Sequence, residues 1–409
     1  MRCSLQDIVV ESFAGYAAAR KLHPRELRAA ACISRCYTPA LGAHVLRCPA
    51  GHFERLQPHA CRHRACPRCA EPARSRWIDA QMLRLLPCGH FHTVFTVPHD
   101  LLALWSYNRE QLTSLLFASA RDSLMELMAD PRRLGVLPGL LLSLHTWGRN
   151  LSYHPHLHCL VSAGGLDANG RWKSSRGHVP VSALPLKKLF RGKFLGGLGE
   201  LLKLGRLKLP AEQDCSYWRQ VVRQLYRTAF NVEVCDTYPH GRGVALYLAR
   251  YVKGGPLPKD RALRCDGRSV AFEYHDHRLD RTQSIRMPVP EFIRRILWHA
   301  PPRGQHLTRH AGLYSSARIQ QHQAAQAELS GLQSSSPWPR PQHGPSTAPI
   351  PLPTEPPRCP HCRLTLQRRP VPQVHQRGEI SLQTPAARTQ ATAQSPRPPP
   401  QRGSTGRSN

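Results

Sequence analysis

The chain has 409 residues with 57 Lys and Arg against 26 Asp and Glu, and its formal net charge of +31 points to a polyanionic partner, most commonly nucleic acid. Its 41% apolar content is enough for two or three domains with real cores, which excludes a wholly disordered protein. No apolar stretch is long enough to cross a membrane and none has the form of a signal peptide, so we expect a cytoplasmic protein.

The N-terminal segment, residues 1–45, has helical composition, and Leu22–Ile33 is its clearest amphipathic stretch. Cysteine and histidine then recur with the spacing of a tetrahedral zinc site, in which thiolate and imidazole are the preferred ligands. Fourteen cysteines without a secretion signal favour reduced thiols that bind metal over disulfides. We expect a structural zinc held by Cys48, Cys61, Cys66 and Cys69, with His52 as the alternative fourth ligand.

The middle of the chain changes from helix to strand and back. Trp77–Leu86 has helical periodicity, and Phe91–Val97 has the composition of a strand that ends at Pro98. Residues 101–128 then predict one long helix that ends before Pro131.

Two further strands, Leu140–Thr146 and Tyr153–Ser162, are separated by a short turn and predict a hairpin. His156 and His158 project from the same strand face, their Cα atoms roughly 6.5–7 Å apart, so that both imidazoles can bind one divalent cation. On its own, such a pair is more often structural than catalytic. The hairpin makes His145 our candidate for a third ligand, and His154 and His92 are the alternatives.

The segments that follow are mostly helical. Residues 183–209 form a leucine-rich basic helix, which suits either a DNA surface or a solvated face over a core. A short helix over Val244–Val252 carries Tyr247 and Tyr251 on one face, at i and i+4. Further elements are expected at 218–230 (helix), 270–275 (strand), 292–298 (helix) and 313–329 (helix).

From about residue 331 the composition turns to proline, glutamine, serine and arginine without apolar periodicity, so we expect a disordered tail. Within it, Cys359-Pro360-His361-Cys362 has the form of a zinc knuckle. Because no second pair lies near it in the sequence, this knuckle stands alone as half a site.

Several segments together resemble the two-tyrosine rolling-circle transposases of the insertion sequence 91 family, within the HUH endonuclease superfamily. The matching segments, in the family's order, are LGAHVLRCPAGH, CRHRACPRC, FHTVFTVPHDL, LHTWGRNLSYHPHLHCLVSAGGL, YLARYVKGG and EFIRRILWHAPPRG. Many family members have a cysteine where Gly51 stands here, which affects the choice of the fourth zinc ligand.

The resemblance implies an α+β fold in which an HUH-type antiparallel sheet is flanked by helices. It places a helical, zinc-binding domain at 1–87, the nuclease and strand-transfer domain at 88–330, and the tail at 331–409.

The resemblance also implies a chemistry. His156 and His158 would hold Mg²⁺ or Mn²⁺ at the scissile phosphate, and Tyr247 and Tyr251 would attack it to give a 5′-phosphotyrosine and a free 3′-OH. Arg250 and Lys253, on the same segment as the tyrosines, are candidates for binding DNA.

The expected substrate is single-stranded or hairpin DNA at the element ends. The host replication machinery is a candidate partner, and the expected location is the nucleoid of a bacterial cell. Two alternatives are a plasmid-type replication initiator or relaxase, and a non-enzymatic zinc protein that binds DNA.

Overall fold

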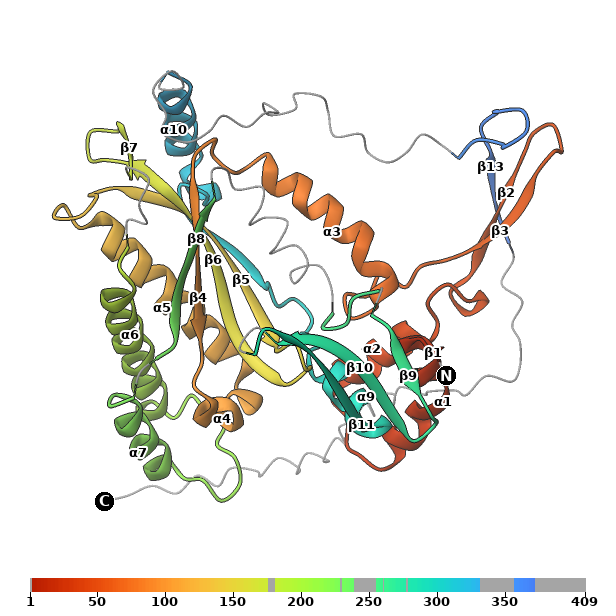
Figure 1. Ribbon diagram of the computed structural model, residues 1–409, viewed down its shortest axis with the longest axis horizontal. Coiled ribbons are helices and arrows are strands. Elements are labelled where there is room, and N and C mark those ends of the chain that lie inside the picture. The colour runs from red at the N-terminus through yellow and green to blue at the C-terminus, as the bar shows by residue number, and fades with distance from the viewer. Residues whose placement is uncertain are drawn as a thin grey trace, which may run out of the picture. The chain divides into compact units, whose positions relative to one another are not determined.

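The computed structural model describes residues 2–175, 181–228, 230–238, 255–259, 261–276, 279–331 and 357–371 (Figure 1). Helices and antiparallel sheets alternate along the chain, which confirms the α+β class. The helices are α1 (Leu5–Ala18), α2 (Pro24–Ser34), α3 (Pro67–Met82), α4 (Leu102–Tyr107), α5 (Arg109–Ala129), α6 (Ala183–Lys203), α7 (Cys215–Leu225), α9 (Val289–Trp298) and α10 (Ile319–Gly331), with short 3-10 turns at Pro39–Leu41, His99–Leu101 and Ser316–Arg318. The strands are β1 (Arg2–Cys3), β2 (Ala43–Arg47), β3 (Glu54–Pro58), β4 (His90–Thr96), β5 (Leu137–Trp147), β6 (Tyr153–Leu166), β7 (Trp172–Ser174), β8 (Val232–Tyr238), β9 (Leu263–Cys265), β10 (Ser269–Asp276), β11 (Arg281–Pro288), β12 (Thr308–Gly312) and β13 (Gln367–Pro370).

The central sheet has the strand order β12-β5-β6-β4-β8, with β7 paired to the end of β6. Helices α5 and α6 cover one face (Figure 1), where their apolar side chains bury Phe91, Leu140 and Leu157. On the other face Leu141 and Leu160 pack in a separate apolar cluster. Since both faces are covered along part of the sheet, β5 and β6 are apolar almost throughout, as expected of strands buried on both sides.

The predicted hairpin is confirmed by β5 and β6, which pair antiparallel across the turn at 148–152. His145 lies directly opposite His156, and Ser143 lies opposite His158. Because side chains alternate along a strand, His145, His156 and His158 all project from one face of the hairpin.

A second sheet, β1-β9-β10-β11, packs with the N-terminal helices. Helices α1 and α2 share a core with α9 and this sheet, through Ile8, Ile33, Phe272 and Phe292. The packing therefore joins residues on both sides of position 87, and a domain boundary there stays a prediction. Cys3 forms a disulfide with Cys265 between β1 and β9, which differs from the expectation that all thiols are reduced.

The third sheet, β13-β2-β3, contains residues from the predicted disordered tail. Strand β13 pairs with β2, so that Gln367 lies opposite Arg47 and Pro370 lies opposite His44. The expectation of disorder from residue 331 is therefore wrong for residues 357–371. The physical reason is that the partner of this strand lies more than 300 residues earlier in the chain, where no local pattern reveals it.

The long helix predicted over 101–128 is interrupted at Asn108, between α4 and α5. The Asn108 side chain donates to the carbonyl oxygen of Lys208 at 2.7 Å and accepts from its backbone N–H at 2.7 Å. These bonds to a distant segment, together with the non-helical backbone of Asn108, favour the break. Among the helices of the described ranges, none combines the length and apolar composition that a bilayer crossing requires.

Candidate functional site

Three histidines from the β5–β6 hairpin, His145, His156 and His158, converge on one of its faces. Their ligand nitrogens all lie within 4.8 Å of one another, and the ring centroids of His145 and His158 are 4.1 Å apart. The opposite face of β6 is anchored in the core by Leu157 and Cys159, which are fully buried. The structure thus brings together all three residues of the predicted catalytic metal site.

Hydrogen bonds fix two of these rings. His156 donates through Nδ1 to the carbonyl oxygen of His154 at 2.6 Å, which leaves its Nε2 lone pair available. The Nδ1 atom of His158 is 2.8 Å from Nε2 of His92 on β4. Metal-binding histidines are commonly oriented by such a bond on their other ring nitrogen.

Electrostatics keep the three imidazoles neutral. Burial lowers the pKa of His156 to about 4, and burial together with the neighbouring histidines lowers the pKa of His145 and of His158 well below the ordinary value. A neutral imidazole is the form that binds a metal. The chemistry of the donor set therefore fits a divalent cation.

The two weaker candidates for the third ligand occupy different places. His92 contacts the group through His158, and burial lowers its pKa to about 4. His154 lies beside His156 and His99, with ring centroids 5.1 and 5.5 Å away. Neither belongs to the convergent group of three.

Aromatic residues near the hairpin could either stack on nucleic-acid bases or pack in the core. Trp147, Tyr153 and Trp172 are all buried. Tyr153 stacks on Trp298 with a centroid distance of 4.6 Å, and Trp147 stacks on His145. All three side chains are therefore part of the packed interior.

The expected zinc cysteines divide between two groups. Cys61, Cys66 and Cys69 come together with Cys36, a residue that the sequence analysis missed. The Sγ atoms of Cys36 and Cys61 lie 3.4 and 3.6 Å from that of Cys69. Tetrahedral zinc–thiolate bonds of about 2.3 Å put the sulfurs roughly 3.8 Å apart, so this group fits zinc.

Local structure presents these thiols on helix ends. Cys66 is the N-cap of α3 and Cys69 lies in its first turn, while Cys36 follows the end of α2. Hydrogen bonds from Cys61 and from backbone N–H groups lower the pKa of Cys66 to about 5. Cys66 is therefore a thiolate at neutral pH, which is the form that binds zinc. Cys36 was missed because it is a single cysteine after a helix, outside the cluster at 48–69.

Cys48 and His52 belong to the second group, with Cys359 and Cys362. The expectation of one zinc site containing Cys48, Cys61, Cys66 and Cys69 is therefore not the arrangement that the structure has. The reason is the strand pairing of β13 with β2, which brings the distant knuckle beside Cys48. The spacing of the knuckle indicated ligands, but nothing in the sequence identified their partners.

The predicted nucleophiles and DNA contacts, Tyr247, Tyr251, Arg250 and Lys253, lie outside the described residues. The residues on either side of that segment are described. Tyr238 pairs with His90 at the end of β4. A side chain added at Gly255 would meet the carbonyl oxygen of Ala65 at 3.1 Å.

Ala65 adjoins Arg64, in the loop between Cys61 and Cys66. Burial is the main cause of the lowered pKa of His145, and the positive charge of Arg64 contributes to it. Burial lowers the pKa of Arg64 itself to about 10, which leaves it charged at neutral pH. The cysteine loop thus contributes a positive charge that acts on His145.

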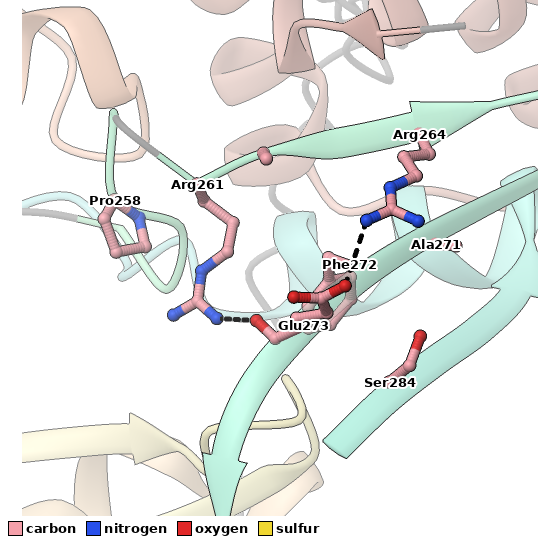
Figure 2. Close-up of a pocket in the computed structure, with 8 residues that line it drawn as sticks. Pro258, Arg261, Arg264, Ala271, Phe272, Glu273 and Ser284 are labelled. Carbon is pink, nitrogen blue, oxygen red and sulfur yellow. Dashed lines mark hydrogen bonds and ion pairs between the residues drawn. The ribbon is translucent and has the colours of Figure 1, made fainter. Parts of the chain in front are cut away.

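A cavity of about 350 Å³ lies on the β9–β10–β11 sheet (Figure 2). Figure 2 shows Arg261 and Arg264 turned toward Glu273: Arg261 donates to its carbonyl oxygen and Arg264 bonds its carboxylate at 3.0 Å. Both guanidinium groups are engaged within the protein, and the lining contains none of the three convergent histidines. We assign no chemistry to this cavity.

Two family models match the chain over different ranges. Residues 139–322 match a family model described as a putative transposase, and residues 8–97 match one described as a transposase zinc-binding domain. The first range contains the histidine hairpin, and the second contains Cys36, Cys61, Cys66 and Cys69.

Two relatives have related sequences. A protein of Sinorhizobium fredii named putative transposase y4qJ is 32% identical over 317 residues, which is 76% of this chain and 80% of that protein. The transposase for insertion sequence element IS801 of Pseudomonas savastanoi pv. phaseolicola is 34% identical over 263 residues, 63% of this chain and 62% of the relative. No solved structure matches the chain.

Proposed function

The chain belongs to the insertion sequence 91 family of transposases, and on that premise we propose that it nicks and transfers single-stranded DNA by a rolling-circle mechanism. The observation that carries the proposal is the convergence of His145, His156 and His158 on one face of the β5–β6 hairpin. Three neutral imidazoles are a donor set for a divalent cation, and the proposed cation is Mn²⁺ or Mg²⁺.

A cation bound there would polarise the scissile phosphate and offset the charge that builds on its oxygens. The protein's own contribution is to hold the imidazoles in place. The carbonyl oxygen of His154 fixes the ring of His156, and His92 fixes the ring of His158. Arg64, whose charge acts on His145, would attract the same phosphate.

We assign the nucleophiles to Tyr247 and Tyr251. The phenolic oxygen of one tyrosine forms a bond to phosphorus, the bond from phosphorus to the 3′-oxygen breaks, and the phenolic proton is passed on while the 3′-oxygen gains one. The phosphoester is exchanged rather than hydrolysed, so rejoining requires no ATP. Arg250 and Lys253, close in sequence, favour the phenolate and bind the DNA backbone.

The residues that flank the tyrosine segment support this assignment. Tyr238 pairs with His90, a residue on the same face of β4 as His92. Gly255 contacts Ala65, next to Arg64. The described residues on either side of the tyrosine segment therefore lie at the central sheet and at the loop that contains Arg64, which is what supports the assignment.

The nearest alternative is a replication initiator or relaxase with the same chemistry on a plasmid origin. Both relatives above are named transposases, and the zinc-binding model matches residues 8–97. These findings favour transposition. The DNA we propose for it is the single-stranded or hairpin ends of the element.

The test is a covalent adduct between the full chain and a single-stranded oligonucleotide that carries an element end, formed with Mn²⁺ and read on a denaturing gel. We expect the double change Tyr247→Phe and Tyr251→Phe to abolish the adduct, and His156→Ala to abolish it with folding intact. Tyr217→Phe, at an exposed tyrosine of α7, is the matched control. DNA binding without any adduct in the unmodified chain would instead support a non-enzymatic zinc protein.

A further inference from the structure

The second cysteine group joins two turns that lie more than 300 residues apart in the sequence. In the first turn, after β2, the N–H of Gly51 donates to the carbonyl of Cys48 at 3.0 Å, and Gly51 has the left-handed φ of +78°. In the second, the N–H of Arg363 donates to the carbonyl of Cys359 at 3.0 Å. Each turn presents two potential ligands, and they face one another.

The four ligand atoms have the separations of a tetrahedral site. The Sγ atom of Cys48 is 3.4 Å from that of Cys362 and 3.9 Å from Nδ1 of His52. All four ligand atoms, including Sγ of Cys359, lie within 4.8 Å of one another. Ligands about 2.0–2.3 Å from zinc are spaced roughly 3.3–3.8 Å apart, so small movements complete the geometry.

The packing around the group is too small to hold the C-terminal segment by itself. Its apolar core contains Leu46 and Leu366 beside the buried Cys48 and Cys359, with Phe53 and Cys362 partly buried around them. Strand β13 adds four residues paired to β2, with all four exposed. Assemblies of this size commonly require a metal to be stable.

We propose that Cys48, His52, Cys359 and Cys362 bind a structural Zn²⁺ that fastens residues 357–371 to the β2–β3 hairpin. This site is separate from the one formed by the Cys36 group, so the described part of the chain would hold two structural zinc ions. Three thiolates and one imidazole leave no open position, as in structural sites. Folding of the C-terminal segment onto the hairpin therefore depends on metal.

Metal content of the full chain, purified with a reducing agent, gives the first test. We expect two zinc ions per chain, and one after Cys359→Ser with Cys362→Ser. Cys48→Ser should also leave one zinc ion per chain. The triple variant Cys48→Ser, Cys359→Ser and Cys362→Ser should still contain one zinc ion. Cys215→Ser, a half-buried cysteine outside both groups, should keep two. Two zinc ions in the double variant would overturn the proposal.

A second test uses the unmodified ligands as well as a variant, so it does not depend on variant folding alone. A protease site is inserted between residues 340 and 341, and the full chain is cleaved after purification. We expect the C-terminal piece to co-elute with the N-terminal piece, to separate from it on metal removal, and to separate without chelator in Cys48→Ser. Co-elution that survives metal removal would show that strand pairing suffices. A Cys48–Cys362 disulfide under reducing conditions would equally contradict the zinc site.

Discussion

The imidazole of His92 lies stacked on that of His158, with their ring centroids 5.0 Å apart and Nε2 of His92 2.8 Å from Nδ1 of His158. His92 is on β4 and His158 on β6, two strands that pair directly. The bond occupies Nδ1 of His158, so a cation at the histidine group would be bound through Nε2. His92 is therefore a positioning residue for the proposed catalytic cation.

Replacing His92 tests that role. We expect His92→Ala to raise the Mn²⁺ concentration for half-maximal adduct formation about 10- to 100-fold, as loss of an outer hydrogen bond to a ligand commonly does. His92→Gln retains a hydrogen-bonding group and should recover part of the affinity. Equal Mn²⁺ requirements in all three proteins would mean that His92 only fills space.

Cys36 distinguishes the site seen in the structure from the one expected from spacing. Cys36→Ser should remove one zinc ion per chain and lower the melting temperature, because zinc binding contributes directly to the folding of small modules. Cys32→Ser, one helical turn earlier and in neither cysteine group, is the control. If Cys36→Ser keeps its full zinc content, the assignment of Cys36 as a ligand is wrong.

The histidine hairpin could be predicted from the sequence because its evidence is local. Two apolar strands and a short turn set the register, which then places His145 opposite His156. The two cysteine groups could not be predicted, since Cys36 and Cys359 reach their partners through tertiary packing and strand pairing between distant segments.

Local sequence patterns also failed to predict where some helices begin and end. Helix α3 begins at Pro67, ten residues before the amphipathic stretch that was recognised, because Cys66 and Pro67 form a favourable N-terminus. The break at Asn108 depends on its bonds to Lys208, a contact across 100 residues.

His299 provides a prediction on pH. It is buried between the hairpin and α9, where it accepts from the Thr146 hydroxyl and donates to the carbonyl of Leu151. Burial lowers its pKa to about 3, so the folded state stays neutral while the unfolded chain takes up a proton below its ordinary pKa of about 6.5. Acid therefore favours the unfolded state between pH 6.5 and 3.

We expect this histidine alone to reduce the free energy of unfolding by about 1.4 kcal/mol for each pH unit below 6.5. Urea unfolding at pH 7, 6 and 5 should show a shallower acid dependence for His299→Gln than for the unmodified protein. His306→Gln, at an exposed position, is the control. An unchanged slope in His299→Gln would contradict the prediction.

Gly165 on β6 lies where the sheet leaves no room for a side chain. A Cβ atom there would collide with the backbone carbonyl of Leu137 on the paired strand β5. Gly165→Ala should cost roughly 1–3 kcal/mol of stability, the usual range for overpacking. Gly192→Ala, in α6 with open space around it, should be neutral or stabilising. Thermal unfolding compares the two, and equal melting temperatures would argue against the close approach.

Arg64 tests whether the cysteine loop takes part in the chemistry. Its charge acts on His145, and the adjoining Ala65 contacts Gly255 at the end of the tyrosine segment. Loss of a positive charge beside a phosphate weakens both DNA binding and stabilisation of the developing charge. Arg64→Ala should therefore slow adduct formation about tenfold or more while zinc content stays unchanged. Arg62→Ala, exposed in the same loop, should react at nearly the normal rate. A similar slowing in both variants would mean that Arg64 contributes only to the general positive charge of the surface. A loss of zinc in Arg64→Ala would mean that its role is structural.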